Sequence, residues 1–271
     1  MAIKFKTVAA IGALLGSLAL VGCGQEEKDP NHIKVGVIVG AEQQVAEVAQ
    51  KVAKDKYGLN VELVTFNDYV LPNEALSKGD IDVNAFQHKP YLDQQIKDRG
   101  YKLVPVGNTF VYPIAGYSKK IKSLDELQPG SQVAIPNDPT NLGRSLLLLQ
   151  QVGLIKLKDG IGLLPTVLDV TENPKNLKLV ELEAPQLPRS LDDAQIALAV
   201  INTTYASQIN LTPAKDGIFV EDKDSPYVNL IVAREDNKDA ENVKKFVQAY
   251  QSDEVSDAAN KIFNGGAVKG W

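Results

Sequence analysis

Short apolar runs alternate with amphipathic stretches along most of the chain. The run IKVGVIVG at 33–40 is β-branched and apolar, which is typical of a buried strand. A second run of this kind, VELVTF, stands at 61–66. Between the two, apolar side chains recur at the i, i+3, i+4 and i+7 positions of one helix face: Val45, Val48, Ala49 and Val52. Strands that alternate with helices of this length predict an α/β protein with largely parallel sheets.

Glycines and capping residues indicate where elements end. NEALSKGDIDVNAF at 73–86 predicts a helix that stops at Gly79, followed by a strand. Ser123 and Glu126 have the spacing of a capping box, so a short helix is expected there, before the turn at Pro129–Gly130 and the strand QVAIP. The apolar stripe of the last helix is predicted at Val243, Phe246, Val247 and Tyr250.

The two halves of the chain contain the same order of parts. The first strand and helix correspond to SQVAIPND with LGRSLLLLQQVG, and DIDVNAFQHKPYL at 80–92 corresponds to QIALAVINTTYAS at 195–207. In this correspondence Phe86 and Asn202 fall within one residue of each other, at the carboxyl end of a strand in each half. Because open α/β sheets bind ligands at the carboxyl ends of their strands, we expect these two positions to face each other across a cleft.

Each half is therefore expected to form one α/β lobe. Lobe 1 comprises residues 32–112 plus 226–271, and lobe 2 comprises residues 113–225. The segments YPIAGYS at 112–118 and YVNLIVA at 227–233 carry the chain from one lobe to the other. Two crossings of this kind form a hinge.

The first residues of the chain resemble a secretion signal. Lys4 and Lys6 precede an apolar run at 8–21, which is too short to span a membrane comfortably. LVGC at 20–23 resembles the lipobox of bacterial lipoproteins, which predicts a signal peptide at 1–22 and a lipidated Cys23 as the first mature residue. Polar, turn-rich residues up to 31 form the expected tether. Since Cys23 is the sole cysteine, the mature domain has neither a disulfide nor a thiolate metal site.

The net charge of the mature chain bears on whether nucleic acid is a partner. The sequence has 29 basic and 34 acidic residues, so removing Lys4 and Lys6 leaves 27 basic residues and a formal charge of −7. A mildly acidic domain of this kind argues against nucleic-acid binding.

Three stretches resemble a known family. VNAFQHKPYL, VAIPNDPTNLGRSL and PYVNLIVARED occur in this order between the lipobox and the C-terminal NGGAVKGW, as in the NlpA family of methionine-binding lipoproteins. The resemblance implies a bilobal type II periplasmic-binding-protein fold and a free amino acid as ligand, which is methionine as either enantiomer. It also implies an ABC importer as partner, with a membrane permease and a cytoplasmic ATPase. The domain would face the periplasm, held to the membrane by its lipid.

A methionine site needs an anion clamp, an ammonium clamp and an apolar slot. Arg144 is expected in the first turn of the helix after NDPTN, where its guanidinium can fork onto a carboxylate beside the helix N-terminus. Asn141 lies three residues earlier on the same turn. The competing interpretations are a solvated or salt-bridged arginine and a simple helix cap.

Two further asparagines interrupt apolar runs. Asn202 follows IALAVI, and Asn229 stands inside YVNLIVA. A buried amide needs a partner, which can be the backbone or the ammonium and carboxylate of a ligand. The family resemblance favours ligand contact for both.

The slot for the thioether is expected among aromatic side chains at the end of one strand and in the adjacent loop. Aromatic edges near sulfur contribute about 0.3 to 1.5 kcal/mol each. The alternative is that these rings are ordinary core, although Tyr and His each keep a polar tip that suits a ligand wall better. The predicted slot residues are Tyr69, Phe86, His88 and Tyr91.

Other roles for His88 have less support in the sequence. The only other histidine, His32, lies at the end of the tether, so no metal site or cofactor is expected. A lyase-like enzyme on the same fold could use His88 as general base with Asp82 or Asp138, but the sequence contains no G-x-S-x-G, Walker or G-x-G-x-x-G motif. The prediction is a binding protein and not an enzyme, with another small apolar amino acid or a methionine-containing dipeptide as the alternative ligand.

Overall fold

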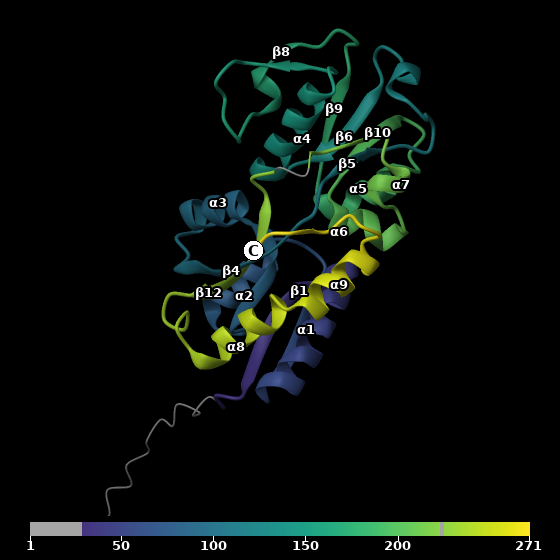
Figure 1. The fold of residues 1–271 in the computed structure, drawn as a ribbon. Coiled ribbons are helices and arrows are strands. Elements are labelled where there is room, and N and C mark those ends of the chain that lie inside the picture. The colour runs from purple at the N-terminus through teal and green to yellow at the C-terminus, as the bar shows by residue number, and fades with distance from the viewer. Residues whose placement is uncertain (1–28, 223–224) are drawn as a thin grey trace, which may run out of the picture.

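The computed structural model describes residues 29–222 and 225–271. The predicted signal peptide, Cys23 and most of the tether lie outside the described residues. Figure 1 shows two lobes. Lobe 2, in teal and green, lies above lobe 1, in purple, blue and yellow. Each lobe is built on one mixed sheet.

Lobe 1 contains a six-stranded sheet in which the second, first and third strands of the chain run parallel. The other three strands are antiparallel to their neighbours. In spatial order the strands are β13 (Val268–Lys269), β4 (Leu103–Val111), β12 (Val228–Arg234), β3 (Val83–His88), β1 (His32–Ile38) and β2 (Asn60–Phe66).

Lobe 2 contains a five-stranded sheet with the same kind of parallel core. A separate antiparallel pair lies beside it, β7 (Lys156–Leu157) with β8 (Val170–Glu172). In spatial order the main strands are β11 (Phe219–Val220), β5 (Ala115–Tyr117), β10 (Ile196–Ile201), β6 (Gln132–Pro136) and β9 (Lys178–Leu182).

The prediction of largely parallel sheets is correct for the cores β2-β1-β3 and β9-β6-β10 and wrong for the remaining strands. Two of these remaining strands, β5 and β12, are the ones on which the chain has just changed lobe. After β4 the chain joins the other sheet as β5, and after β11 it returns as β12. Such a strand enters its new sheet from the edge that faces the other lobe, where the parallel strands end. It therefore runs against them.

Helices cover both sheets, and among those in the described residues three α-helices, α5, α6 and α7, are single turns. None of the helices in the described residues is long and apolar enough to cross a membrane. Lobe 1 carries α1 (Ala41–Tyr57), α2 (Leu71–Lys78), α3 (Lys89–Arg99), α8 (Glu241–Tyr250) and α9 (Asp253–Ile262). Lobe 2 carries α4 (Pro139–Gln151), α5 (Leu187–Ser190), α6 (Thr203–Ala206) and α7 (Pro213–Asp216), and the 3₁₀ turns are η1 (Leu124–Glu126), η2 (Val167–Asp169), η3 (Ala184–Gln186) and η4 (Ser207–Ile209).

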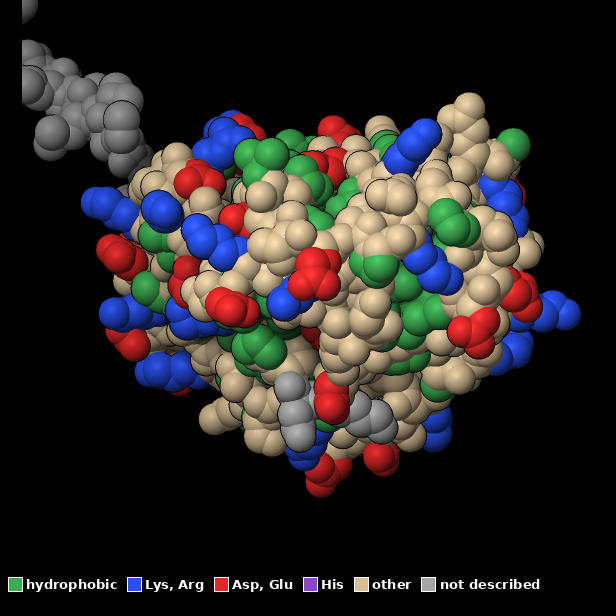
Figure 2. Space-filling model, turned by 90° about the horizontal axis from the view of Figure 1, so that it is seen from above, with side chains coloured by type: hydrophobic (Ala, Val, Ile, Leu, Met, Phe, Trp, Pro, Cys, Tyr) green, Lys and Arg blue, Asp and Glu red, His purple; other side chains and the backbone are tan. Residues whose placement is uncertain are grey.

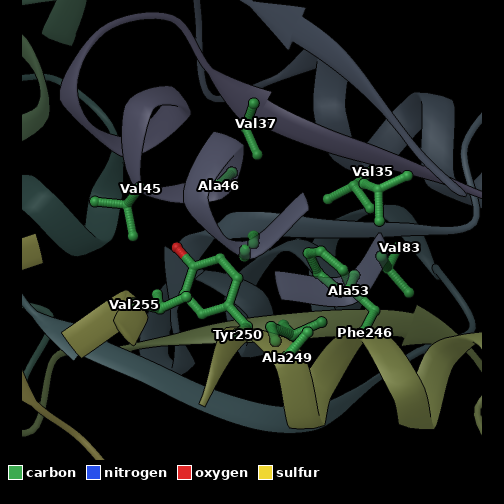
Figure 3. Close-up of a cluster of buried hydrophobic side chains, with 14 of the residues drawn as sticks. Val35, Val37, Val45, Ala46, Ala53, Val83, Phe246, Ala249, Tyr250 and Val255 are labelled. Atoms are coloured by element: carbon green, nitrogen blue, oxygen red, sulfur yellow. The ribbon is translucent and has the colours of Figure 1, made fainter. Parts of the chain in front are cut away.

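The core of lobe 1 joins the beginning of the chain to its end. Figure 3 shows Phe246 and Tyr250 of α8 and Val255 of α9 gathered with Val45 of α1 and Val35 of β1. All five side chains are buried. The C-terminal helices therefore complete the lobe that the first helix begins.

The predicted ends and caps of the helices are confirmed at Gly79, and they differ from the structure at Ser123 and at the end of the chain. Gly79 ends α2 in the left-handed conformation, with φ 85°, as predicted. Ser123 makes no capping bond, and Glu126 instead accepts from the backbone N–H of Lys122 at 3.0 Å. The stripe predicted for the last helix is confirmed in α8, but α9 follows, capped by Ser252.

The surface carries charges of both signs. Figure 2, which looks onto the molecule from above, shows acidic and basic side chains interspersed over that face, with apolar side chains between them. A mixture of this kind produces no strong field of one sign.

Candidate functional site

One cavity lies between the two sheets. Its lining side chains come from both lobes, and the space between them that is open to water is about 20 Å³, room for about one water molecule, so the lobes are closed around it. All eight residues predicted for ligand binding line this cavity: Tyr69, Phe86, His88, Tyr91, Asn141, Arg144, Asn202 and Asn229. Beside them lie Gln87, Tyr112, Thr203 and Thr204.

Strand ends bring these residues together. β3 ends at His88, and β10 ends one residue before Asn202, which precedes the first turn of α6. Asn229 lies on β12 in register with His88. The expectation that Phe86 and Asn202 meet at one cavity is therefore correct, and it follows from the carboxyl ends of the parallel strands in the two sheets.

Aromatic rings form one wall of the cavity. The ring of Phe86 lies 5.9 Å from that of Tyr69 and 6.0 Å from that of Tyr91, measured between centroids. The hydroxyl of Tyr91 donates to the backbone oxygen of Tyr69 at 2.8 Å, which fixes the two rings relative to each other. On the outer side Tyr205 packs against Tyr69 at 5.0 Å. The wall is therefore apolar on its face, and the hydroxyl of Tyr91 is already satisfied.

Both ring nitrogens of His88 have partners in the protein. His88 caps α3, where its Nδ1 accepts from the backbone N–H of Tyr91 at 3.1 Å. Nδ1 therefore carries no proton, and Nε2 donates to Oδ1 of Asn141 at 3.2 Å. Burial, with the charge of Arg144, lowers the pKa of His88 to about 3. The ring is neutral at ordinary pH.

The proposed partners of a catalytic His88 are engaged elsewhere. Asp82 accepts from the backbone N–H of Lys34 at 2.9 Å, and Asp138 caps α4 by accepting from the backbone N–H of Asn141 at 3.0 Å. In the described part of the chain, no three His, Cys, Asp or Glu side chains are grouped so that they could hold a metal ion.

The amides of the cavity form a chain of hydrogen bonds. Nδ2 of Asn202 donates to Oδ1 of Asn141 at 2.8 Å, and Nδ2 of Asn141 donates to the Asp138 carboxylate at 2.9 Å. Nδ2 of Asn229 donates to the backbone oxygen of Phe86 at 3.1 Å. Oδ1 of Asn202 is buried and accepts no hydrogen bond from the described protein groups. It is a buried acceptor without a donor among the described protein groups, on a residue that lines the cavity.

Arg144 is less available than the sequence suggests. Its Nε donates to Oε1 of Glu221 at 2.8 Å, its Nη2 donates to the second carboxylate oxygen of Glu221 and to the backbone oxygen of Tyr112 at 3.0 Å, and its guanidinium carbon lies 4.4 Å from the Tyr227 ring centroid. Both expected roles are therefore combined, since the side chain lines the cavity and is salt-bridged. Nη1 is the nitrogen for which the described residues supply no hydrogen bond.

The predicted place of Arg144 on its helix is wrong. α4 begins at Pro139 with Asp138 as its cap, so Arg144 lies in the second turn. The first-turn amide of Asn141 already donates to Asp138, so it is not free to join Arg144 in an anion clamp. Pro139 is the reason for the earlier start, because proline is favoured in the first turn of a helix.

Sequence reasoning missed two charged or aromatic residues behind the cavity. Glu221 stands in the acidic run EDKDS, which has the composition of an exposed loop, yet its side chain is 11% exposed and paired with Arg144. Tyr227 packs edge-on to His88 at 5.0 Å. Thr203 and Thr204 follow Asn202 directly, so their position after an apolar strand was the one available signal for them.

The whole chain resembles proteins with known names and structures. D-methionine-binding lipoprotein MetQ of Escherichia coli is 92% identical over 271 residues, all of both chains, and Lipoprotein 28 of the same organism is 62% identical over 258 residues, 95% of each. The crystal structure of the methionine binding protein MetQ matches with 93% identity and a TM-score of 0.89, over 90% of this chain and 99% of that one. A Burkholderia cenocepacia nutrient binding protein bound to methionine matches with 55% identity and a TM-score of 0.85, over 88% of this chain and all of the other.

These likenesses confirm the predicted fold, two α/β lobes of the type II periplasmic-binding class joined by two crossing segments. The family model for NlpA lipoprotein matches residues 33–271, which is nearly all of the part that the structure describes. Together with the full-length relatives, this match establishes that the chain belongs to the NlpA lipoprotein family.

Proposed function

We propose that the protein captures methionine, in its L and D forms, between the lobes and delivers it to an ABC importer without chemical change. The observation that carries the proposal is the composition of the cavity. It combines an arginine, a buried amide oxygen without a protein donor and a wall of aromatic rings in the lining of one cavity between the lobes. These are the three kinds of contact that a zwitterion with a thioether tail needs.

The polar end of the cavity suits the zwitterion. Nη1 of Arg144 donates to the ligand carboxylate while Glu221 and Tyr112 hold the rest of the guanidinium still. Oδ1 of Asn202 accepts from the ligand ammonium and thereby gains the partner that the protein does not give it. Because Arg144 and Glu221 cancel each other's charge, the pocket suits a neutral zwitterion better than an anion.

The apolar end suits the side chain of methionine. Burying such a side chain contributes about 1.5–3 kcal/mol, and sulfur near the edge of an aromatic ring adds about 0.3–1.5 kcal/mol per contact. Phe86 and Tyr91 meet at 76°, so the wall presents both a face and an edge to the tail.

The neutral state of His88 supports capture without catalysis. A general base needs a pKa near the working pH, whereas the pKa of His88 is lowered to about 3, chiefly by burial. Its two nitrogens instead hold the start of α3 and the Asn141 amide. His88 therefore acts as a fixed part of the wall.

We place the hinge at the two segments between the lobes, with lobe 1 at 32–112 and 226–271 and lobe 2 at 113–225. Hydrogen bonds that bridge this division support closure, such as Nε2 of Gln208 to the backbone oxygen of Val39 at 2.9 Å and the Tyr205 hydroxyl to that of Asn67 at 3.3 Å. Ligand contacts with both lobes shift the population from open to closed.

The expected partners follow from the family. Cleavage after residue 22 and lipidation of Cys23 would anchor the chain in the bacterial cell envelope with its lobes in the periplasm. There the closed form would dock on a permease driven by a cytoplasmic ATPase. A neighbouring solved structure, 49% identical with a TM-score of 0.85, is the periplasmic substrate-binding protein of an ABC transporter from Coxiella burnetii.

Calorimetry tests the ligand. The full-length protein in detergent is unfolded, freed of bound ligand by dialysis, refolded and titrated with L- and D-methionine, other small apolar amino acids and methionine-containing dipeptides. Saturable binding of methionine at one site is expected. Indifference to both enantiomers would refute the proposal, stronger binding of another compound would change the ligand, and a released product would favour the lyase-like alternative.

A further inference from the structure

A buried carboxyl group bridges the two lobes. Glu42 lies in the first turn of α1 in lobe 1 and is 2% exposed. The hydroxyl of Thr204, on α6 of lobe 2, donates a short hydrogen bond to its Oε1. α6 is the turn that begins directly after Asn202. The bond therefore joins the first helix of one lobe to the rim of the cavity in the other.

The surroundings of Glu42 contain hydroxyl groups and apolar side chains. The titratable groups that face it are tyrosines from four places: Tyr69 after β2, Tyr112 after β4, Tyr205 on α6 and Tyr250 on α8. α9 contributes Val255 to the same core. Among the described residues, no lysine, arginine or histidine acts on the carboxyl of Glu42.

This setting favours the neutral acid. Burial raises the pKa of Glu42 to about 8, and the hydrogen bond from Thr204 opposes the rise only in part. Burial also raises the pKa of all four tyrosines, so they stay neutral below pH 9. The pKa of His88 is lowered to about 3 in the closed form, so any proton that His88 exchanges on closure is released, opposite in sign to the uptake at Glu42.

We propose that Glu42 and Thr204 form a protonation-dependent clasp between the lobes, so that closure on the ligand takes up one proton at Glu42. The proposal rests on the proposed function, because it takes capture to be the closing of two lobes. When α6 moves away with lobe 2, water reaches the carboxyl and the group ionises as an ordinary glutamic acid. When the lobes close, the acid is buried again and must be neutral.

The direction of the effect follows from linkage. The pKa of Glu42 is about 4.5 when open to water and about 8 when the lobes are closed. A group whose pKa is higher in the closed form than in the open form stabilises the closed form. This stabilisation is complete below the pKa of the open form and is lost as the pH rises to the pKa of the closed form. Ligand affinity therefore falls as the pH increases from about 5 to about 8 and is level above that range.

Proton uptake can be measured directly by calorimetry. Methionine is titrated into the full-length protein at pH 6.5 in buffers with different ionisation enthalpies. The dependence of the heat on the buffer should give about one proton taken up for each methionine bound, and about none at pH 9.5. The affinity should fall by at least about tenfold between pH 5.5 and pH 8.

Two substitutions on the same helix make the matched comparison. Glu42→Gln keeps the amide oxygen as an acceptor for Thr204 but cannot titrate, so it should abolish the uptake and flatten the pH profile. Glu47 is exposed on α1, and its carboxylate accepts from Gln43. Glu47→Gln should therefore leave both the uptake and the profile unchanged. Heats that are independent of buffer in the wild type, or uptake that survives Glu42→Gln, would overturn the clasp.

A measurement without ligand separates this proposal from the proposed function. Spin labels at Lys97→Cys on α3 and Lys158→Cys in lobe 2, both exposed positions, report the distance between the lobes. The closed population should increase from pH 8.5 to pH 5.5, and it should not do so with Glu42→Gln. If methionine fails to bind but this shift is found, the ligand is wrong and the clasp stands. If the closed population does not change with pH, the proposed clasp between Glu42 and Thr204 is wrong.

Discussion

The guanidinium of Arg144 and the carboxylate of Glu221 form a buried ion pair, with side chains 4% and 11% exposed, in which Nε donates to Oε1 at 2.8 Å. Glu221 also accepts from the backbone N–H of Ile114 at 3.4 Å. One carboxylate thus touches the first of the two segments that connect the lobes and the arginine of the cavity.

Replacing Arg144 is expected to affect stability and binding separately. Arg144→Met leaves the Glu221 charge buried without a partner, which should cost about 3–5 kcal/mol of unfolding free energy. Losing its bond to the ligand carboxylate should weaken methionine binding about 10- to 100-fold, since a hydrogen bond to a charged group contributes about 1.5–3 kcal/mol. Urea unfolding and calorimetry measure the two effects.

The double substitution Arg144→Met with Glu221→Gln is the control. It removes both charges, so most of the lost stability should return while binding stays weak. Wild-type affinity in the double variant would show that Arg144 does not hold the ligand.

Asn229→Ala should weaken methionine binding about 10- to 100-fold. The substitution removes a cavity amide and the donor to the backbone oxygen of Phe86, and an unpaired buried polar group costs about 1–3 kcal/mol. The control is Asn108→Ala, which removes an exposed bond from Nδ2 to the backbone oxygen of Gly270, at a residue outside the cavity lining. Equal affinities for the two variants would count against a ligand contact at Asn229.

Norleucine should bind more weakly than methionine by about two- to tenfold. It replaces the sulfur with a methylene of similar size, so the difference reports the contacts between sulfur and the rings of the wall. Competition calorimetry measures the ratio. Tyr69→Leu removes one ring and should bring the two affinities closer together, and an unchanged ratio would exclude Tyr69 from the slot.

Acid should destabilise the protein in part through His88. The pKa of this ring is about 3 in the folded state, lowered chiefly by burial, and near 6.5 when unfolded. Its contribution to the unfolding free energy is therefore complete above pH 6.5 and is lost as the pH falls, by about 2 kcal/mol at pH 5. Urea unfolding at pH 7 and pH 5 should show a smaller loss for His88→Gln than for the wild type. An identical loss would mean that His88 titrates normally.

The periodicity of the sequence predicted the parallel core of each sheet and the helices that cover it, because these elements are specified by neighbours in the chain. It did not predict that β5 and β12 run antiparallel, since that depends on the side from which a strand enters the opposite lobe. The short helix after Ser123 was predicted in the right place, as the 3₁₀ turn η1, but the capping box expected from the spacing of Ser123 and Glu126 does not form.

The cavity could be largely predicted because its residues lie at the ends of apolar strands or interrupt them. Phe86, His88 and Asn202 all follow this rule. Glu221 could not be predicted in this way. An acidic run gives no sign that one of its carboxylates is buried against an arginine 77 positions earlier. Partners so distant in sequence are brought together only by the folding of lobe 2, to which both belong.

The position of Asn229 on β12 limits which changes in chain length the protein can tolerate. Side chains of a strand alternate between its two faces, so a shift of one residue would turn Asn229 away from the cavity. β12 is held in register with His88 of β3 on one side and with Val111 of β4 on the other. A single insertion within β12 would exchange the residues that line the cavity. Libraries for new ligand specificity should therefore vary side chains on this strand and keep its length fixed.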